Sequence, residues 1–204
     1  MVNTDSAAVY VRYAASPPKQ GAIVFKNNAD GNEIDYLIIG DDGSLSDKTI
    51  RVKSKDSSDA DGEVYEAHGQ PLAATVISGE RVRVYTFNAD MEIIELCLDG
   101  DVDAKTTGES NKWFKGQLST EALEWNQKEV VDKKNPPPKT ATRAKAAPNS
   151  SITALSELDY TAVGAPKTSW SSVIKVYFNP AHNPNVVAVA SFNGTKWSAK
   201  ELRK

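Results

Sequence analysis

Short runs in which apolar and polar residues alternate cover most of this chain, and turn residues separate the runs. Within residues 81–87, Val82 and Val84 fall on one face of an extended segment, whereas Arg83 and Tyr85 fall on the other. A period of two predicts a β-strand, because successive side chains of a strand point to opposite faces. Helical periodicity is almost absent, so the sequence predicts an all-β protein.

The clearest group of predicted strands lies between residues 71 and 118. Asp99 and Gly100 give a strong hairpin signal between its third and fourth strands. Four sequential strands joined by turns form a meander, and a meander of this length is typical of one blade of a β-propeller. The four strands are expected at residues 72–78, 81–87, 92–98 and 112–118.

The same pattern returns later in the chain, which indicates an internal repeat. Its strands are expected at residues 151–158, 173–178, 186–192 and 196–202. The dipeptides Val84-Tyr85, Asp99-Gly100 and Lys112-Trp113 of the first group match Val176-Tyr177, Asn193-Gly194 and Lys196-Trp197. A weaker copy has strands at residues 7–14, 21–25, 33–39 and 48–53. The chain is therefore interpreted as about three propeller-type blades.

Two polar segments fall outside these blades. Residues 55–62 are rich in Asp and Ser and predict a loop, whereas residues 133–139 contain three consecutive prolines, which cannot donate ladder hydrogen bonds. The basic residues between 133 and 148 have no assigned role and are expected to lie on a solvated linker. We expect a single domain over residues 1–204, with blade 1 at about 6–54, blade 2 at about 70–118, a linker or insertion at 119–150 and blade 3 at about 151–204.

Composition excludes several classes of protein. The net charge of −3 favours neither nucleic acid nor anionic lipid as a partner, and no apolar run is long enough to insert into a membrane. Cys97 is the only cysteine, which excludes an intrachain disulfide. No signal-peptide pattern is present, so we expect a cytoplasmic protein, or one secreted without a signal peptide. His68 and His182 lack neighbours at ligand spacing, and no catalytic motif occurs; we therefore expect no metal, no cofactor and no catalytic residue.

The middle blade resembles the blades of the fungal fucose-specific lectins, the family of the orange-peel-fungus lectin. The resemblance rests on Val82-Arg83-Val84-Tyr85 in the second strand, on Glu95 within the third, and on the Lys-Trp-x-x-Gly-x-Leu pattern of residues 112–118. It is weaker in the last blade and faint in the first. It implies a carbohydrate-binding protein that prefers fucosylated glycans and is not an enzyme.

The resemblance also implies where a sugar would bind, namely between neighbouring blades. Arg83 and Glu95 of the middle blade would hold the ring hydroxyls, and Phe192 and Trp197 of the last blade would cover the apolar face of the sugar. The other two sites are degraded. Asp35 and Trp113 would form one of them, where Ile23 replaces the expected arginine; in the other, Lys175 replaces arginine and Val189 replaces glutamate.

Other interpretations stay open at this point. Arg83 and Glu95 are also consistent with an ordinary ion pair across a hairpin. A fungal biosynthetic enzyme of the cyclase or cycloaddition type, built on a lectin-like propeller, is one alternative function; a degraded propeller used for protein–protein contact is another. Because propellers typically contain four to eight blades, we expect a homodimer that completes a six-bladed ring. A four-bladed monomer, with a further blade hidden in residues 119–150, is the rival.

Overall fold

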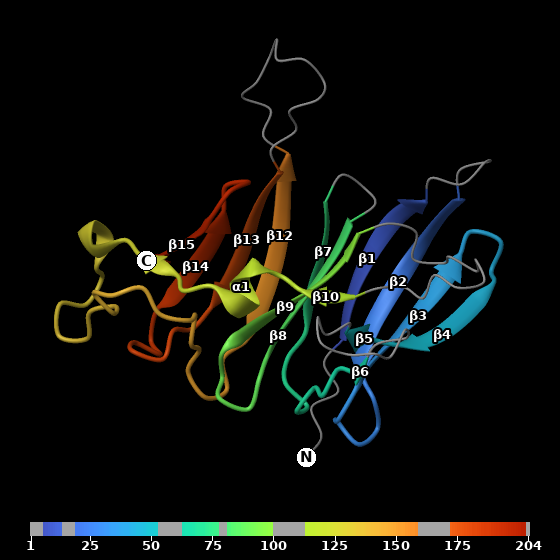
Figure 1. Ribbon diagram of the computed structural model, residues 1–204, viewed down its shortest axis with the longest axis horizontal. Helices are drawn as coiled ribbons and strands as arrows, with labels where there is room; N and C mark the ends of the chain where they lie inside the picture. Colours follow the sequence, from blue (N-terminus) through green and yellow to red (C-terminus); the bar gives the residue numbers. More distant parts are fainter. Residues whose placement is uncertain are drawn as a thin grey trace, which may run out of the picture.

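The computed structural model describes residues 6–13, 19–52, 63–77, 81–99, 113–158 and 172–202. Within this part the chain forms three large sheets that stand side by side, as Figure 1 shows, and one sheet of two short strands. The first contains β1 (Ser6–Tyr13), β2 (Lys19–Asn27), β3 (Ile34–Gly40) and β4 (Leu45–Thr49) in that order. The second contains β7 (Ala73–Ile77), β8 (Arg81–Phe87), β9 (Ile93–Asp99) and β10 (Phe114–Lys115). The third contains β12 (Ile152–Leu158), β13 (Ser172–Phe178), β14 (Val187–Phe192) and β15 (Trp197–Leu202).

Each sheet is an antiparallel meander, and the first strands of the three sheets lie next to one another. Strand β7 contacts both β1 and β12, and the Ser156 hydroxyl on β12 donates a hydrogen bond of 2.6 Å to the Val76 carbonyl on β7. The sheets therefore radiate from a shared line of first strands, as blades do in a propeller. The prediction of an all-β protein with about three four-stranded blades is confirmed.

The middle sheet is buried on both of its faces, and this explains its continuous apolar character. Val82, Val84 and Leu96 belong to a cluster that the middle sheet shares with the first sheet. Tyr85 and Phe87 belong to a second cluster, which it shares with the third sheet. Strands of the outer sheets instead alternate between buried and more exposed positions. In the described part of the chain, only one face of each outer sheet packs against another sheet.

Two predicted fourth strands differ from those observed. In the first sheet the return strand is β4, not residues 48–53, because a tight turn at Gly43 (φ +77°) reverses the chain directly after β3. Residues Arg51–Val52 (β5) pair instead with Glu63–Val64 (β6). In the middle sheet the fourth strand ends after two residues, because the chain turns at Gly116 into the short helix α1 (Gln117–Thr120). The predicted loop 55–62 and the residues between 100 and 112 lie outside the described residues.

The segment between α1 and β12 packs against the sheets and is not a free linker. Strand β11 (Glu124–Trp125) pairs in parallel with β15, and a short 3-10 helix (η1, Gln127–Glu129) follows. Leu123, Ala144 and Ala146 are almost completely buried in the cluster between the middle and third sheets. Residues 119–150 add one short strand to the third sheet rather than forming a further four-stranded blade. In the described part of the chain, no helix is long and apolar enough to cross a membrane.

Candidate functional site

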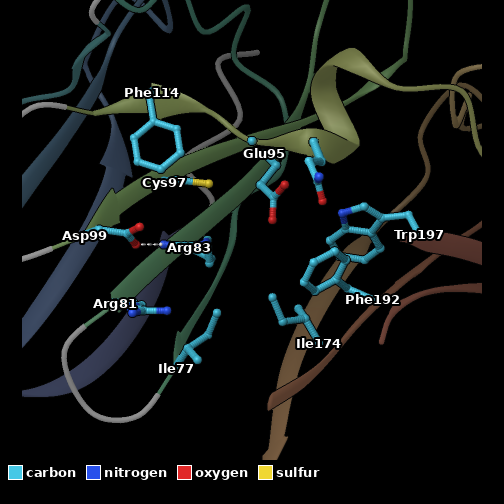
Figure 2. Close-up of a pocket in the computed structure, with 12 residues that line it drawn as sticks. Ile77, Arg81, Arg83, Glu95, Cys97, Asp99, Phe114, Ile174, Phe192 and Trp197 are labelled. Carbon is cyan, nitrogen blue, oxygen red and sulfur yellow. Dashed lines mark ion pairs between the residues drawn. The ribbon is translucent and has the colours of Figure 1, made fainter. Parts of the chain in front are cut away.

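A pocket of about 290 Å³ lies between the middle and third sheets, and all four residues expected to bind a sugar line it. Figure 2 shows Arg83 and Glu95 on the side of the middle sheet, with Phe192 and Trp197 on the opposite side. One side of the pocket is thus polar and charged, and the other is aromatic. The structure brings these four residues together from β8, β9, β14 and β15.

Glu95 is a buried carboxylate that is held by several hydrogen bonds. Its side chain accepts one from the Tyr85 hydroxyl (3.0 Å) and one from the backbone N–H of Leu118 (3.2 Å). Glu95 is only 3% exposed. Burial raises its pKa above the usual glutamate range, although both hydrogen bonds and the nearby charge of Arg83 act in the opposite direction.

The turn that begins α1 holds Glu95 in place. The backbone N–H of Gly116 donates to the Glu95 carbonyl at 2.9 Å. The Ser119 hydroxyl both accepts from the Glu95 N–H (2.6 Å) and donates to the Glu95 carbonyl (2.9 Å). A Cβ atom added to Gly116 would overlap the Glu95 carboxylate, so only glycine permits this close approach.

Arg83 is the second polar group of the pocket, and its ion-pair partner is Asp99. Its Nη1 lies 2.7 Å from Asp99 Oδ1 and donates to the Val82 carbonyl at 2.9 Å. The interpretation of Arg83 and Glu95 as an ordinary ion pair is therefore wrong. In the register of the sheet Arg83 lies opposite Cys97, whereas Glu95 lies opposite Tyr85. The guanidinium group is held by the Asp99 carboxylate and by two carbonyls, those of Val82 and Leu98 (3.5 Å), and it lines the pocket.

The aromatic side of the pocket comes entirely from the third sheet. The rings of Phe192 and Trp197 lie 5.3 Å apart at an interplanar angle of 39°, and they are opposite each other in the β14–β15 register. Trp197 also makes an edge contact with Tyr85, at 6.5 Å and 77°. Trp197 therefore packs against Tyr85, whose hydroxyl donates a hydrogen bond to Glu95. Trp197 is 5% exposed, so its orientation is fixed by packing.

Sequence reasoning missed several residues that line the same pocket. Asp99, Arg81 and Cys97 lie on the same face of β8 and β9 as Arg83 and Glu95. The alternation of the two strands contained this signal, because residues two apart on a strand share a face. Asp99 was expected at a hairpin turn and not in the sugar site, but it is the last residue of β9. Burial raises the pKa of Cys97, so its thiol stays protonated and acts as a small apolar group.

The two residues of the expected second, degraded site take part in the packing and hydrogen bonding of the first two sheets. Trp113 is 1% exposed and packs edge-on against Phe25 (5.9 Å) and Tyr36 (5.7 Å) in the core between the first and middle sheets. Its ring is therefore covered by protein. Asp35 accepts a hydrogen bond of 2.8 Å from the Thr49 hydroxyl within the first sheet. Asp35 and Trp113 therefore serve the structure of the first two sheets.

Metal-binding groups are not found in the described part of the chain: no three His, Cys, Asp or Glu residues gather there in a way that could hold an ion. His182 instead lies 3.0 Å from Glu201, measured from Nε2 to Oε1. The side chains that line the pocket between the middle and third sheets offer hydrogen bonds, charge and aromatic surface. These are the interactions that hold a polar ligand with an apolar face.

Comparisons with known proteins agree with this arrangement of sheets. No protein-family model matches the sequence, and no curated protein does. The structure is similar to that of Aleuria aurantia lectin, a fungal lectin with a six-bladed β-propeller fold and a novel fucose recognition mode, with a TM-score of 0.57, 20% identity, and coverage of 98% of this chain and 48% of that one. A mutant of the same lectin in complex with alpha-methyl-L-fucoside gives a TM-score of 0.56 at 20% identity, with the same coverage.

A mutant of AofleA from Arthrobotrys oligospora gives a TM-score of 0.56 at 17% identity, with coverage of 100% of this chain and 42% of that one. This chain therefore spans less than half the length of each of these proteins. At these identities the similarity concerns the fold. The expected resemblance to the fungal fucose-specific lectins is confirmed at that level: the chain has the blade architecture of these six-bladed propellers and covers about three of the blades.

Proposed function

We propose that this protein is a non-catalytic lectin that binds fucosylated glycans in the pocket between its middle and third sheets. One observation carries the proposal: a charged side formed by Arg83 and Glu95 faces an aromatic side formed by Phe192 and Trp197. A sugar ring presents hydroxyls in some directions and C–H groups in others. The two sides of the pocket match these two kinds of surface.

The roles of the four residues follow from their chemistry. The Glu95 carboxylate accepts hydrogen bonds from sugar hydroxyls, and the Arg83 guanidinium donates to them; both bonds are strengthened by charge. Trp197 and Phe192 cover the C–H face and the methyl group of fucose, and the fixed rings lose little conformational entropy on binding. The neighbouring structures solved with fucosides support this choice of sugar.

The test is a titration of alpha-methyl-L-fucoside into the purified protein, followed by tryptophan fluorescence. We expect saturable binding at one site per chain. Arg83→Lys keeps the charge but loses the planar fork, and Glu95→Gln keeps the shape but loses the charge; each should weaken binding by about tenfold or more. Circular dichroism spectra and melting temperatures show whether each variant is folded.

The matched control is Lys175→Ala. Lys175 occupies the place in the third sheet that corresponds to Arg83 in the middle sheet, but it lies outside the pocket. Its replacement should leave the affinity unchanged. A folded wild-type protein that shows no response at millimolar fucoside would overturn the lectin proposal. The enzyme and protein-contact alternatives would then become the leading hypotheses.

We also propose that two copies of this chain join into a six-bladed ring. The first sheet presents its Ile23 and Phe25 face to the middle sheet, and the middle sheet presents its Arg83 and Tyr85 face to the third. Among the described strands, no sheet packs against the corresponding face of the third sheet, on which Lys175 lies. In the part of the chain that the structure describes, no sheet packs against the opposite face of the first sheet either.

Part of the open face of the first sheet is apolar, which supports a protein partner there. The rows that cross its four strands place Tyr10 beside Ala22, Ile39 and Leu45, and Ala8 beside Val24, Leu37 and Asp47. Tyr10 is 56% exposed and Leu45 is 67% exposed. Contact between the third sheet of one copy and the first sheet of another is head-to-tail, and two such contacts close a ring.

The structural similarity to the fungal lectin from Aleuria aurantia favours a fungal source for this protein.

A further inference from the structure

A second pocket lies away from the proposed fucose site and shares no residue with it. Its volume is about 330 Å³, within the range of small-molecule sites. Most of its lining comes from the segment between α1 and β12, together with Glu92 and the turn after β13. The residues that line it are Glu92, Trp125, Pro138, Thr142, Arg143, Lys145, Ala181 and His182.

The segment that forms this pocket is tied down on two sides. Glu92 and Lys145 form an antiparallel bridge, and Ala146 forms another with Pro180. The Lys145 carbonyl accepts a hydrogen bond from the Ala181 N–H at 2.9 Å. The backbone of the pocket is therefore already ordered, and a ligand would not need to order it on binding.

Trp125 and His182 give the pocket a fixed aromatic surface. Their ring centroids lie 4.7 Å apart at 87°, and Trp125 also contacts Phe178 edge-on at 6.2 Å. His182 is held in place by Glu201, whose other carboxylate oxygen accepts a hydrogen bond of 2.7 Å from the Val131 N–H. With Pro138 these rings offer an apolar surface of the kind that covers the C–H face of a sugar.

The charges at the pocket are unequal. Arg143 Nη1 lies 2.7 Å from Glu92 Oε2, and Lys145 contributes a second positive charge near the same carboxylate. Burial opposes the ionisation of Glu92, but hydrogen bonds from Arg143 and Asn88 outweigh it and hold its pKa below the usual range. Glu92 is the only acid among the lining residues, where it is shared by two cations, and the Glu201 carboxylate lies behind the pocket against His182.

We propose that this pocket is a second sugar-binding site, selective for a monosaccharide unit that carries a carboxylate, such as a uronic or sialic acid. The apolar face of the ring would lie against Trp125 and Pro138. The carboxylate would accept charge-assisted hydrogen bonds from Lys145 and Arg143. A neutral sugar of the same shape would lack the second interaction. The pocket thereby gives a role to the basic segment between residues 133 and 148.

The test is a titration of the full chain with glucuronic acid, followed by the indole N–H signals in ¹H–¹⁵N NMR spectra. Trp125→Phe and Trp197→Phe assign the two indole signals that report on the two pockets. Glucuronic acid should shift the Trp125 signal and leave that of Trp197 unchanged. Glucose, its neutral counterpart, and succinate, a carboxylate without a sugar ring, should each bind at least about tenfold more weakly.

Matched lysine variants complete the experiment. Lys145→Gln should weaken the binding of glucuronic acid by about tenfold, whereas Lys139→Gln, in the same segment but outside the pocket, should have no effect. Binding of fucoside, read at Trp197, should be unchanged in both variants, so failure of this proposal and failure of the fucose proposal are distinguishable. Equal binding of glucose and glucuronic acid, equal binding of succinate, or no shift of the Trp125 signal would overturn the proposal.

Discussion

At the scale of single residues, the arrangement around Glu95 is the most demanding feature of the molecule. A buried carboxylate is costly unless hydrogen bonds satisfy it, and Glu95 receives them from Tyr85 and Leu118. Gly116 lies directly against this carboxylate. The missing side chain at Gly116 is therefore as important to the pocket as the residues that would touch a ligand.

Replacement of Gly116 by alanine tests this feature. The added Cβ would overlap the Glu95 carboxylate, and either Glu95 or the turn at α1 must move. We expect a loss of stability of about 1–3 kcal/mol, typical of overpacking, together with loss of fucoside binding. Chemical denaturation and the fluorescence titration measure the two effects. Unchanged affinity in Gly116→Ala would contradict the positioning role of this close approach.

The protonation of Glu95 predicts a pH dependence of fucoside binding. Because burial raises its pKa, Glu95 takes up a proton at a higher pH than an ordinary glutamate as the pH falls. Protonation removes the charged acceptor, so affinity should decrease as the pH falls through this pKa and stay constant above it. Titrations at a series of pH values measure the effect. Glu95→Gln should bind weakly with no such dependence; a wild-type affinity that is flat with pH would contradict the role of Glu95.

How far the sequence predicts the site differs from residue to residue. Arg83, Glu95, Phe192 and Trp197 were expected and do line one pocket, because the motifs that carried them lie on regular strands with known facing directions. The pairing of Arg83 with Asp99 was not foreseen. This ion pair depends on the orientation of the Asp99 side chain at the end of β9, and the alternation of apolar and polar residues does not specify that orientation.

At the scale of elements, the short helix α1 replaces the second half of an expected strand. The chain leaves the sheet at Gly116, and Ser119 then reaches back to hydrogen-bond both backbone groups of Glu95. Ser119 is 2% exposed. Helix α1 therefore completes the hydrogen bonding of β9 with a side chain where a longer strand would have used its backbone.

Replacement of Ser119 by alanine tests whether its hydroxyl is needed to hydrogen-bond the backbone of Glu95. The variant leaves the buried N–H of Glu95 without this partner, whereas the Glu95 carbonyl keeps the Gly116 N–H, so we expect a loss of stability of about 1–3 kcal/mol in urea denaturation. Thr120→Ala is the matched control, because its hydroxyl makes only long contacts of 3.4 Å. Equal stability of the two variants would show that Ser119 is not needed to satisfy β9.

The bounds of strands were predicted well where apolar and polar residues alternate over many positions. They were predicted poorly where a local turn sets the start or end of the strand. Strands β8 and β13 have nearly the expected bounds. Strand β4 begins earlier than expected because the turn before it is tight. Strand β11 was missed because it has only two residues and its pairing with β15 is parallel and distant in sequence.

At the scale of the whole molecule, the described strands cover the middle sheet on both faces but cover each outer sheet on only one. Exposed Tyr10 and Leu45 lie on the open face of the first sheet. Contiguous apolar surface of this kind is typical of a protein–protein interface. This difference between the sheets supports the proposed ring of two chains.

Leu45→Lys tests that assembly. A charge in the proposed contact should shift the protein from dimer to monomer in light scattering coupled to gel filtration, measured over a series of protein concentrations. Val131→Lys places the same charge at another exposed apolar residue, whose N–H is bound to the buried Glu201 of β15, and should leave the dimer intact. A wild-type protein that is monomeric at all concentrations would contradict the proposed ring.

The position of the four expected site residues has a further consequence for how binding would respond to dilution. Arg83, Glu95, Phe192 and Trp197 meet at a junction whose two sides both belong to the same chain. Intrinsic affinity there would be the same at nanomolar and at micromolar protein. Only the number of sites presented together would change with concentration, so a single chain would hold one glycan while a pair could crosslink two.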